Sequence, residues 1–401
     1  MKATMSNIPK GYKQTEVGVI PEDWVVKPVS EAFQICNNLR LPISQKVREK
    51  MAGPYPYYGP TNIQGYINEY RVEGEYSLIG EDGDHFLKWR ETSMTFLVNG
   101  KFNVNNHAHL IKGVDNLTSW FYYYFAHKDI TQYLTRQGAG RYKLTKNTLT
   151  QIPCALPPTK AEQTAIAAAL SDADAFISIL EKLIAKKCNI KQGAMQELLT
   201  GKKRLPGFSG KWEVKKLGEI AIFFSGGTPS TSIASYYGGG IPWITSGDLN
   251  KGVIYEVDGR ITNQGLENSS AKMIEENTLL IALYGATSGV TAISKIRAAI
   301  NQAVLAIIPR TDNSTFLLFK LGYLKNWIIK TYTQGGQPNL SCDIIKSIEV
   351  TLPHITEQTA IAQILSDMDA EIEALEQKLN KYRQIKQGMM QELLTGKTRL
   401  V

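Results

Sequence analysis

Cysteine is scarce in this chain of 401 residues, and its placement excludes two classes of small fold. The cysteines lie far apart and form no C-x-x-C pair, which argues against a disulfide scaffold and against a zinc ribbon or finger. They are Cys36, Cys154, Cys188 and Cys342. Residues 1–13 contain no apolar run of the kind found in signal peptides, and the most apolar stretch, residues 278–293, is shorter than the ~18 residues of a membrane span. We therefore expect a cytoplasmic protein without a membrane segment.

Motifs for cofactor and hydrolase chemistry are also missing. The sequence Gly-Lys-Thr at 396–398 resembles the end of a phosphate-binding loop, but Gln391 stands where that loop needs its first glycine. Residues 138–143 lack the third glycine of a dinucleotide-binding fingerprint, and no Gly-x-Ser-x-Gly nucleophile elbow occurs. We therefore expect no catalytic residue in this chain. The formal net charge of +8 makes a polyanion the first partner to consider.

An internal repeat determines the organisation of the chain. Residues 162–205 and 357–400 are identical at 29 of 44 positions without a gap, at a constant offset of 195. Shorter matches precede them: Trp24 aligns with Trp212, and Asn106-His-Ala aligns with Asn301-Gln-Ala. The chain is therefore two tandem copies of one unit, each with a variable front and a nearly constant tail.

The repeat predicts an α+β fold with two mainly β domains, each followed by a long helix, related by a pseudo-twofold axis. The predicted boundaries are 1–158 and 202–354 for the domains, and 159–201 and 355–401 for the helices. Within the domains, short apolar runs between Gly, Pro, Asn and Asp predict strands, for example at 76–79, 94–98, 278–283 and 303–308. Helices are predicted at 120–134 and 315–333.

A 3.5-residue apolar period marks both tails as coiled-coil helices. Thr159 and Glu162 are spaced as a capping box at the start of the first helix, and Gly201 and Gly396 are placed to end the two helices. Separate packing of two amphipathic helices into two cores is the alternative. The predicted seam residues are Ile166, Leu170, Ile177, Leu180, Ile184, Ile361, Leu365, Met368, Ile372, Leu375 and Leu379.

The charges along the two helices favour antiparallel pairing, because each helix is acidic in its first half and basic in its second. Antiparallel pairing lays acid against base and brings Asp174 near Arg383 and Glu371 near Lys186. Each exposed pair contributes only ~0.2–1 kcal/mol, and part of the asymmetry suits each helix's own dipole. Such a pair places the two fronts at opposite ends of a rod.

Two polar clusters in the first front could suggest a metal ion or a nuclease site. His107 and His109 lie two residues apart, but no third ligand is near them in the sequence, so a structural role is favoured. Residues 81–84 form an acidic loop, but the comparable loop of the second copy, 284–286, carries no acid. Because a site needed in both halves should occur in both, the chain is predicted to be a binding protein without a metal site.

Together these features resemble one known family. The residues that carry the resemblance are Gly11–Trp24 (GYKQTEVGVIPEDW), Gln192–Gly201 (QGAMQELLTG), Gly226–Ser230 (GGTPS), Ile241–Ile244 (IPWI) and Ile300–Ala303 (INQA). The chain is similar, over essentially its whole length, to the specificity subunit of type I restriction–modification enzymes. The first front departs from the pattern, since it has Tyr-Pro-Tyr-Tyr-Gly at 55–59 where the second has Ile-Pro-Trp-Ile, so the two are expected to read different half-sites.

That resemblance implies two target-recognition domains, each reading one half of a bipartite, asymmetric DNA sequence, with the helices setting the spacing. It also implies two modification subunits, which bind S-adenosylmethionine and methylate adenine and which dock on the helices. Two restriction subunits would add translocation and cleavage that depend on ATP and magnesium. No cofactor is expected on this chain itself.

Glycine-rich loops with amides, hydroxyls and nearby Lys or Arg suit contacts with phosphates and base edges, and we expect the DNA-binding residues among them. In the first domain the candidates are Tyr57, Tyr58, Lys88, Arg90, Gln137, Arg141 and Lys143. In the second domain they are Gly226, Gly227, Thr228, Ser230, Thr245, Ser246, Asp248, Tyr284, Thr287, Ser288, Gln334, Gln337 and Asn339.

Three other readings stay open at this point. They are a specificity subunit of a fused restriction–methylation enzyme, a self-contained DNA methyltransferase or nuclease, and a scaffold held by its coiled coil that does not bind DNA. Activity of the isolated chain with S-adenosylmethionine or magnesium would favour the second. A lack of salt-sensitive affinity for duplex DNA would favour the third.

Overall fold

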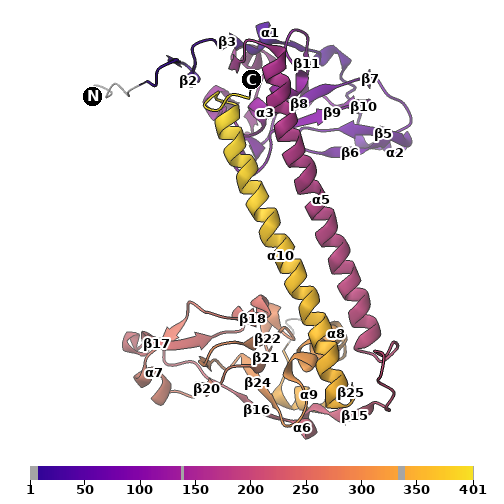
Figure 1. Cartoon of the computed structure of the whole chain (residues 1–401), viewed down its shortest axis with the longest axis vertical. Helices are drawn as coiled ribbons and strands as arrows, with labels where there is room; N and C mark the ends of the chain where they lie inside the picture. The colour runs from indigo at the N-terminus through magenta and orange to yellow at the C-terminus, as the bar shows by residue number, and fades with distance from the viewer. Residues whose placement is uncertain (1–7, 137–139, 333–338, 401) are drawn as a thin grey trace. The chain divides into compact units, whose positions relative to one another are not determined.

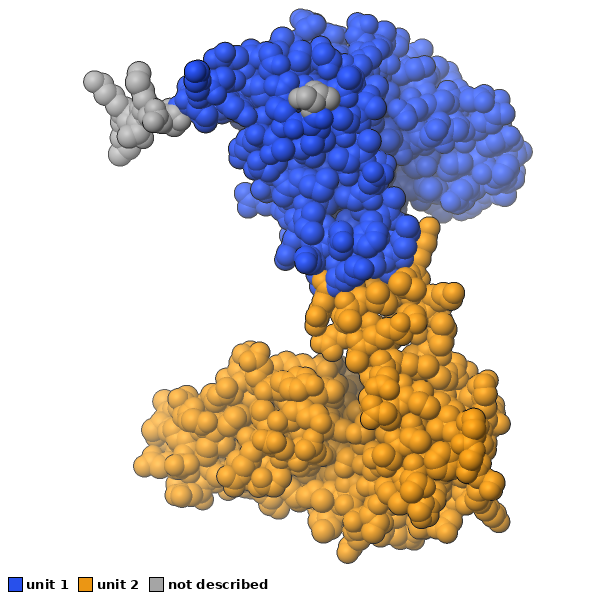
Figure 2. All heavy atoms as spheres, viewed as in Figure 1, with its two compact units in different colours: residues 1–181, 378–401 blue, residues 182–377 orange. Residues whose placement is uncertain are grey.

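The structure is a computed structural model of the chain, and it describes residues 8–136, 140–332 and 339–400. The chain forms two compact units, one of residues 1–181 with 378–401 and one of residues 182–377, which Figure 2 shows in different colours. The borders fall inside the two long helices, α5 (Lys160–Leu198) and α10 (Ile355–Leu393). Each unit therefore combines the front of one copy with parts of both helices. The four boundaries expected from the repeat stay predictions.

The front of the first unit is built on two four-stranded sheets. One has the strand order β6 (Ile63–Ile67), β5 (Ala52–Tyr58), β10 (Lys101–Val104), β7 (Val72–Glu73). The other has the order β4 (Phe33–Ile35), β11 (Ala108–Gly113), β8 (Tyr76–Gly80), β9 (Thr95–Val98). The two-stranded ribbons are β1 (Tyr12–Thr15) with β2 (Gly18–Pro21), β3 (Val25–Pro28) with β14 (Pro153–Leu156), and β12 (Thr135–Arg136) with β13 (Tyr142–Lys143). The helices are α1 (Val29–Ala32), α2 (Gln45–Glu49), α3 (Thr118–Ala126) and α4 (Lys146–Gln151), with 3₁₀ turns η1 (Asn37–Leu39), η2 (Asp84–Lys88) and η3 (Thr131–Tyr133).

The front of the second unit repeats this plan (Figure 1). Its five-stranded sheet has the order β16 (Ala221–Ser225), β24 (Val304–Pro309), β21 (Thr278–Ala282), β22 (Thr291–Ser294), β18 (Val253–Ile254). Its four-stranded sheet has the order β19 (Arg260–Ile261), β17 (Tyr237–Ile244), β23 (Ala298–Ile300), β20 (Lys272–Ile274), and β15 (Glu213–Lys216) pairs with β25 (Glu349–Leu352). The helices are α6 (Leu217–Ile220), α7 (Asn263–Glu267), α8 (Ser314–Tyr332) and α9 (Cys342–Ser347), with 3₁₀ turns η4 (Ala234–Tyr236), η5 (Asp248–Lys251) and η6 (Gly285–Thr287).

The two fronts share their connectivity as well as their strand count. The sheet β4-β11-β8-β9 corresponds to β16-β24-β21-β22, and a parallel strand pair lies at the same place in each front, β5 with β10 and β17 with β23. The second front has a further parallel pair, β18 with β22. Helix α3 packs on β8, β9 and β11, and α8 packs on β21 and β22. In each core an aromatic pair lies at the same place, Trp24 on Trp120 and Trp212 on Phe316. The α+β tandem repeat predicted from the sequence is confirmed.

One predicted helix is too long. The sequence predicts a helix at 120–134, but α3 ends at Ala126 and residues 131–133 form the separate turn η3. The Asp129 carboxylate accepts hydrogen bonds from both the N–H and the hydroxyl of Thr131, which starts a new turn and competes with continued helix. The helix predicted at 315–333 agrees with α8.

The two long helices pack antiparallel in both units. The ion pairs between them are Asp174–Lys386, Glu181–Arg383, Lys187–Glu371 and Lys191–Asp369. Residue numbers rise along α5 as they fall along α10, which confirms the predicted direction. Asp174 and Arg383 line the same cavity, and the ion pairs are formed with residues close to the predicted neighbours: Asp174 with Lys386, and Glu371 with Lys187. The charge pattern of the two helices determines that they run antiparallel, but it does not determine which residues lie opposite one another.

The apolar stripes of both helices lie in this packed face. Ile166, Leu170, Leu180, Ile361, Leu365 and Leu379 are buried, and Ile177, Ile184, Met368, Ile372 and Leu375 are half-buried. In the described part of the chain one helix, α5, is long and apolar enough by composition to cross a membrane. That is weak evidence for a membrane span, because its apolar residues pack against α10.

In the first unit, an arginine that follows α10 binds a glutamate in the first turn of α5. Arg399 donates from Nε and Nη2 to the two carboxylate oxygens of Glu162, which is fully buried, and the Nη2 bond measures 2.8 Å. Arg399 also donates two bonds of 3.0 Å to Asp23 and lies 6.0 Å from the ring of Trp24. These hydrogen bonds hold the pKa of Asp23 below its usual value. We call this group of residues the first clasp.

The second unit has the matching arrangement, which we call the second clasp. Arg204, which follows α5, donates from Nε and Nη2 to Glu357 in the first turn of α10 at 2.6 Å each. Its Nη1 donates to the Gly210 carbonyl at 2.7 Å, and its guanidinium lies 5.7 Å from the Trp212 ring. Glu357 is 2% exposed. Each clasp therefore ties the tail of one copy to the helix start of the other.

Local features of the sequence support the clasps. Gly201 and Gly396, which end the helices as predicted, have φ of +69° and +71°, and a Cβ on Gly396 would lie 2.5 Å from Pro21. The predicted capping box is only half formed. The Thr159 hydroxyl accepts from the N–H of Glu162 at 3.2 Å, but the Glu162 carboxylate binds Arg399 and does not cap the helix. Glu162 thus binds Arg399, a cation far away in the sequence, and not the backbone N–H at the start of its own helix.

We expect Arg399→Met to destabilise the protein by on the order of 3 kcal/mol, because the buried Glu162 carboxylate loses its counter-charge. Urea unfolding followed by circular dichroism measures the change. Lys397→Met is the control, since Lys397 is exposed and its nearest carboxylate is 3.9 Å away. Equal stability of the two variants would contradict a stabilising role for the first clasp.

Candidate nucleic-acid interface

In the second unit, three loops meet at the short connection between β23 and β24, residues 301–303. The Gly226 N–H donates to the Asn301 carbonyl at 3.3 Å, and the Asn301 N–H donates to the Ile244 carbonyl at 3.1 Å. The Leu283 N–H donates to the Ala303 carbonyl at 2.8 Å. The loops that follow β16, β17 and β21 are therefore joined by backbone hydrogen bonds, and most candidate DNA-binding residues of this domain lie on them.

Glycine is required where the first of these loops crosses the connection. A Cβ on Gly226 would lie 1.7 Å from the Ile300 carbonyl oxygen, and one on Gly227 would lie 2.0 Å from the Ser270 hydroxyl. Both glycines are buried, so they position the loop, and any ligand contact falls to their neighbours. Thr228 and Ser230, which follow them, are exposed.

Several candidates of the second domain use their polar atoms within the loops. The Thr245 N–H and hydroxyl both donate to Asp248 Oδ2, at 2.9 and 2.8 Å. Ser288 is 2% exposed and donates to the Leu283 carbonyl, and the Thr287 hydroxyl donates to the Tyr284 carbonyl. These hydrogen bonds stabilise the loops and leave few polar atoms of these side chains to bind a ligand. Ser246 is half-buried in the same turn.

The exposed polar groups gather around Gln302. The Thr228 hydroxyl donates to Gln302 Oε1 at 2.5 Å, which leaves the Gln302 amide nitrogen as a donor for a base edge. Tyr284 is 44% exposed and forms a β-bridge with Asn339, which is also exposed. Gln334 and Gln337 lie outside the described residues. Thr228, Gln302, Tyr284 and Asn339 are thus the side chains of this loop cluster that can meet a ligand.

The first unit has the same loop cluster with different side chains. The Glu81 N–H donates to the His107 carbonyl at 2.7 Å, and the Leu144 N–H donates to the Glu81 carbonyl at 2.7 Å. The Glu81 carboxylate binds Arg40 at 2.6 Å and lies 3.4 Å from Lys143. The half-buried Glu81 carboxylate thus faces two cations, and a second carboxylate, Asp82, binds the exposed side chain of His107.

The two histidines of this cluster have separate roles. His109 is fully buried, its Nδ1 accepts from the Asn37 amide, and its Nε2–H donates to the Leu144 carbonyl. Burial lowers the pKa of His109, which keeps the ring neutral. His107 is half-exposed and binds Asp82 at 2.7 Å. The structural role favoured for this pair from the sequence fits His109. No group of three or more metal-ligating side chains occurs among the residues that the structure describes.

Of the candidates in the first domain, two lie in or beside the loop cluster and one supports the fold. Lys143 belongs to the cluster, and Arg141 is an exposed neighbour of it in the sequence. Tyr57 is fully buried, with its hydroxyl accepting from the Ile43 N–H and donating to the Leu41 carbonyl, so it supports the fold and offers no group to a ligand.

Three further candidates of the first domain have no side-chain hydrogen bond or ion pair to the cluster within the described residues. Tyr58 is half-buried, and burial raises the pKa of its hydroxyl. Lys88 and Arg90 are exposed, but within the described residues no hydrogen bond or ion pair joins them to the cluster. Gln137 lies outside the described part of the chain.

The hydrogen bonds correct one detail of the sequence alignment. Asn105 and Asn301 occupy the same position: each N–H donates to the residue that ends the neighbouring strand, Tyr58 or Ile244, and each Oδ1 accepts from the N–H two residues later. The match of Asn106 with Asn301 is therefore wrong by one residue, since Asn106 corresponds to Gln302. Sequence reasoning missed Arg40, Asn106 and Gln302 as residues of the two loop clusters. The asparagine shared by the two fronts is the signal that marks them.

Comparisons with known proteins agree with this arrangement. A family model described as "Type I restriction modification DNA specificity domain" matches the chain twice, at residues 21–186 and 209–384. The putative type I restriction enzyme MjaX specificity subunit of Methanocaldococcus jannaschii is 26% identical, covering 98% of this chain and 97% of that protein. A putative type I restriction enzyme specificity subunit of Haemophilus influenzae, S.HindORF215P, is 41% identical over 33% of each chain. The crystal structure of a type I restriction–modification S subunit from M. genitalium has the same fold, with a TM-score of 0.64 at 17% identity, covering 92% of this chain and 96% of that one.

We expect Gln302→Ala to weaken recognition of one half of a DNA target about tenfold or more, because a good base-edge contact contributes ~1–3 kcal/mol of discrimination. Binding of the chain, assembled with its partner subunits, to duplexes that carry the full target measures the loss. Gln377→Ala is the control, since Gln377 is exposed on α10 outside the loop cluster. Unchanged affinity and specificity in Gln302→Ala would exclude this residue from the interface.

Proposed function

The chain belongs to the family of type I restriction–modification DNA specificity domains, and from that premise we propose that each copy reads one half of a bipartite, asymmetric DNA target. The observation that carries this proposal is the loop cluster found at the same place in both fronts. The backbone hydrogen bonds of the cluster are alike, whereas its exposed side chains differ: Asn106 and His107 in the first copy, Gln302 and Ala303 in the second. A shared backbone arrangement that carries different exposed side chains suits two domains that recognise different DNA sequences.

The chain is a type I restriction–modification specificity subunit with two DNA specificity domains. It acts in a complex with DNA and with other subunits of the system, and the catalytic steps belong to those subunits. The family match supports this reading and not a self-contained methyltransferase or nuclease.

The composition of the complex is part of the proposal. Two modification subunits are supported by the two nearly identical helices, which offer the same docking surface twice. Two restriction subunits complete the complex. S-adenosylmethionine, ATP and magnesium are then bound by these partners and not by this chain, and the complex works in the cytoplasm, where its DNA substrate lies.

The helix pair is proposed to set the gap between the half-sites. Four interhelical ion pairs and a continuous apolar seam fix the register of α5 against α10, and each clasp locks a helix end. Variation in the fronts then changes the bases that are read and leaves the gap unchanged.

Exchange of residues 206–353 for the equivalent segment of a relative tests the proposal. Sequencing the methylated adenines made by the exchanged chain with its partner subunits should show one new half-site, one unchanged half-site and the same gap. The helices are retained in this exchange, so the gap acts as an internal control. A change in both half-sites would contradict independent reading, and a changed gap would contradict the role of the helices.

A further inference from the structure

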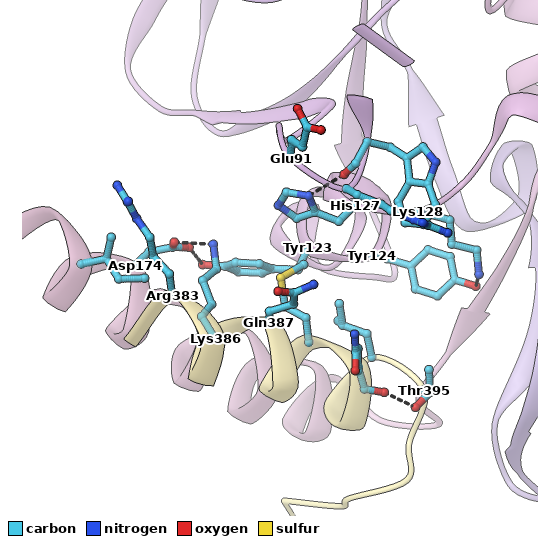
Figure 3. Close-up of a pocket in the computed structure, with 16 residues that line it drawn as sticks. Glu91, Tyr123, Tyr124, His127, Lys128, Asp174, Arg383, Lys386, Gln387 and Thr395 are labelled. Carbon is cyan, nitrogen blue, oxygen red and sulfur yellow. Dashed lines mark hydrogen bonds and ion pairs between the residues drawn. The ribbon is translucent and has the colours of Figure 1, made fainter. Parts of the chain in front are cut away.

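A cavity of about 530 Å³ opens in the first unit, where α3, the residues after η2 and both long helices meet. Figure 3 shows side chains from these elements around it. Those that carry polar groups include Arg90, Glu91, Tyr123, Tyr124, His127, Lys128, Asp174, Arg383, Lys386 and Gln387. The volume is in the range of pockets for small organic ligands, and of the described candidate DNA-binding residues only Arg90 lines it.

One part of the lining suits a flat apolar or aromatic group. Tyr124 is 6% exposed and stacks on Trp120 with ring centroids 6.3 Å apart. Met390 and Leu394, from α10 and the residue that follows it, are 9% and 8% exposed and belong to the hydrophobic core of the unit. Trp89 adds a second aromatic ring to the lining. A planar ring placed here would contact aromatic and thioether groups.

The polar part of the lining carries cations that lack a carboxylate partner. Lys386 is neutralised by Asp174 at 2.5 Å. Lys128 donates to the Tyr124 hydroxyl at 3.0 Å, and Arg90 lies 4.8 Å from the Trp89 ring, but neither has an ion-pair partner among the described residues. Burial lowers the pKa of Lys128, because no anion offsets the lost hydration of its ammonium group. A ligand with an anionic group would supply that missing charge.

At the corresponding place in the second unit, a lysine replaces the tyrosine. Gln163 and Gln358 accept from the N–H groups of Leu117 and Asn313, which makes Lys320 the counterpart of Tyr124. Lys320 is 5% exposed, and its Nζ donates to the Leu199 carbonyl at 2.6 Å, at the end of α5. The nearly identical helices thus lie beside Tyr124 in one unit and beside Lys320 in the other.

This asymmetry separates the cavity from the docking of partner subunits. Under the proposed function, the modification subunits bind both nearly identical helices, so a feature they need should occur in both units. A cavity whose lining differs from that of its counterpart, with Tyr124 in place of Lys320, suits a ligand that binds once per chain. This step rests on the proposed function.

The geometry points to a binding site in this cavity for one small aromatic anion, with its ring against Tyr124 and Met390 and its anionic group at Lys128 and Arg90. Nucleotides and aromatic carboxylates share this chemistry. The bound ligand would contact the front of the first copy and the end of α10 together, and it would therefore stabilise the first unit.

Isothermal titration of the full-length chain tests the site, with adenosine monophosphate and indole-3-acetate as probes and with adenosine and inorganic phosphate as half-ligands. We expect one probe to bind with one-to-one stoichiometry, at least tenfold more tightly than either half-ligand. Binding of the nucleotide alone or of the carboxylate alone identifies the source of the anion. Lys128→Gln should weaken binding at least tenfold, while Lys146→Gln, which changes an exposed lysine of the same unit, should leave it unchanged.

A second variant removes the ring against which the ligand is placed and introduces the lysine of the second unit. Tyr124→Lys copies the second unit and should abolish binding, and thermal unfolding with and without the probe checks that the variant is folded. The site is refuted if neither probe binds at millimolar concentrations, if phosphate binds as tightly as the nucleotide, or if Lys128→Gln binds like the native chain. The titration contains no DNA and no partner subunit, so its failure leaves the proposed function standing, and failure of the domain exchange leaves the measured binding standing.

Discussion

The rest of the structure depends on the pairing of Arg399 with Glu162 and of Arg204 with Glu357. A carboxylate that is almost fully buried is stable only with a counter-charge and hydrogen bonds, and the arginine after each helix supplies both. Because that carboxylate lies in the first turn of the other copy's helix, each compact unit needs residues from both copies. The two clasps therefore explain why the compact units and the sequence repeats have different borders.

The clasps are alike but not equal. Arg399 binds a second carboxylate, Asp23, whereas the residue before Trp212 is Lys211, and Arg204 binds a backbone carbonyl in its place. The first unit thus has two acids around one arginine, and the second has one. The similarity between the two copies lies in their nearly constant tails. The differences between the two copies lie in their variable fronts, and they include the exposed side chains of the loop clusters and the replacement of Tyr124 by Lys320.

The features that could be predicted from the sequence are periodic or repeated. The seam from Ile166 to Leu379 follows a 3.5-residue period, and opposite charges along the helices fix their direction. The features that could not be predicted depend on contacts between distant residues. Glu162 has the spacing of a capping box, but its carboxylate binds a residue 237 positions away. Tyr57 has the composition of a binding loop, yet burial decides its role. The loop cluster is held by backbone hydrogen bonds, so only a shared asparagine marks it in the sequence.

Hydrogen–deuterium exchange of the Glu357→Gln variant tests most directly that each unit is built from both copies. The account predicts faster exchange at the start of α10 and, in the other copy, at residues 198–204, where the end of α5 and Arg204 lose their charged partner. Residues 160–181 should exchange as in the native chain, because they belong to the first unit. Faster exchange confined to the second copy, with residues 198–204 unchanged, would contradict the account.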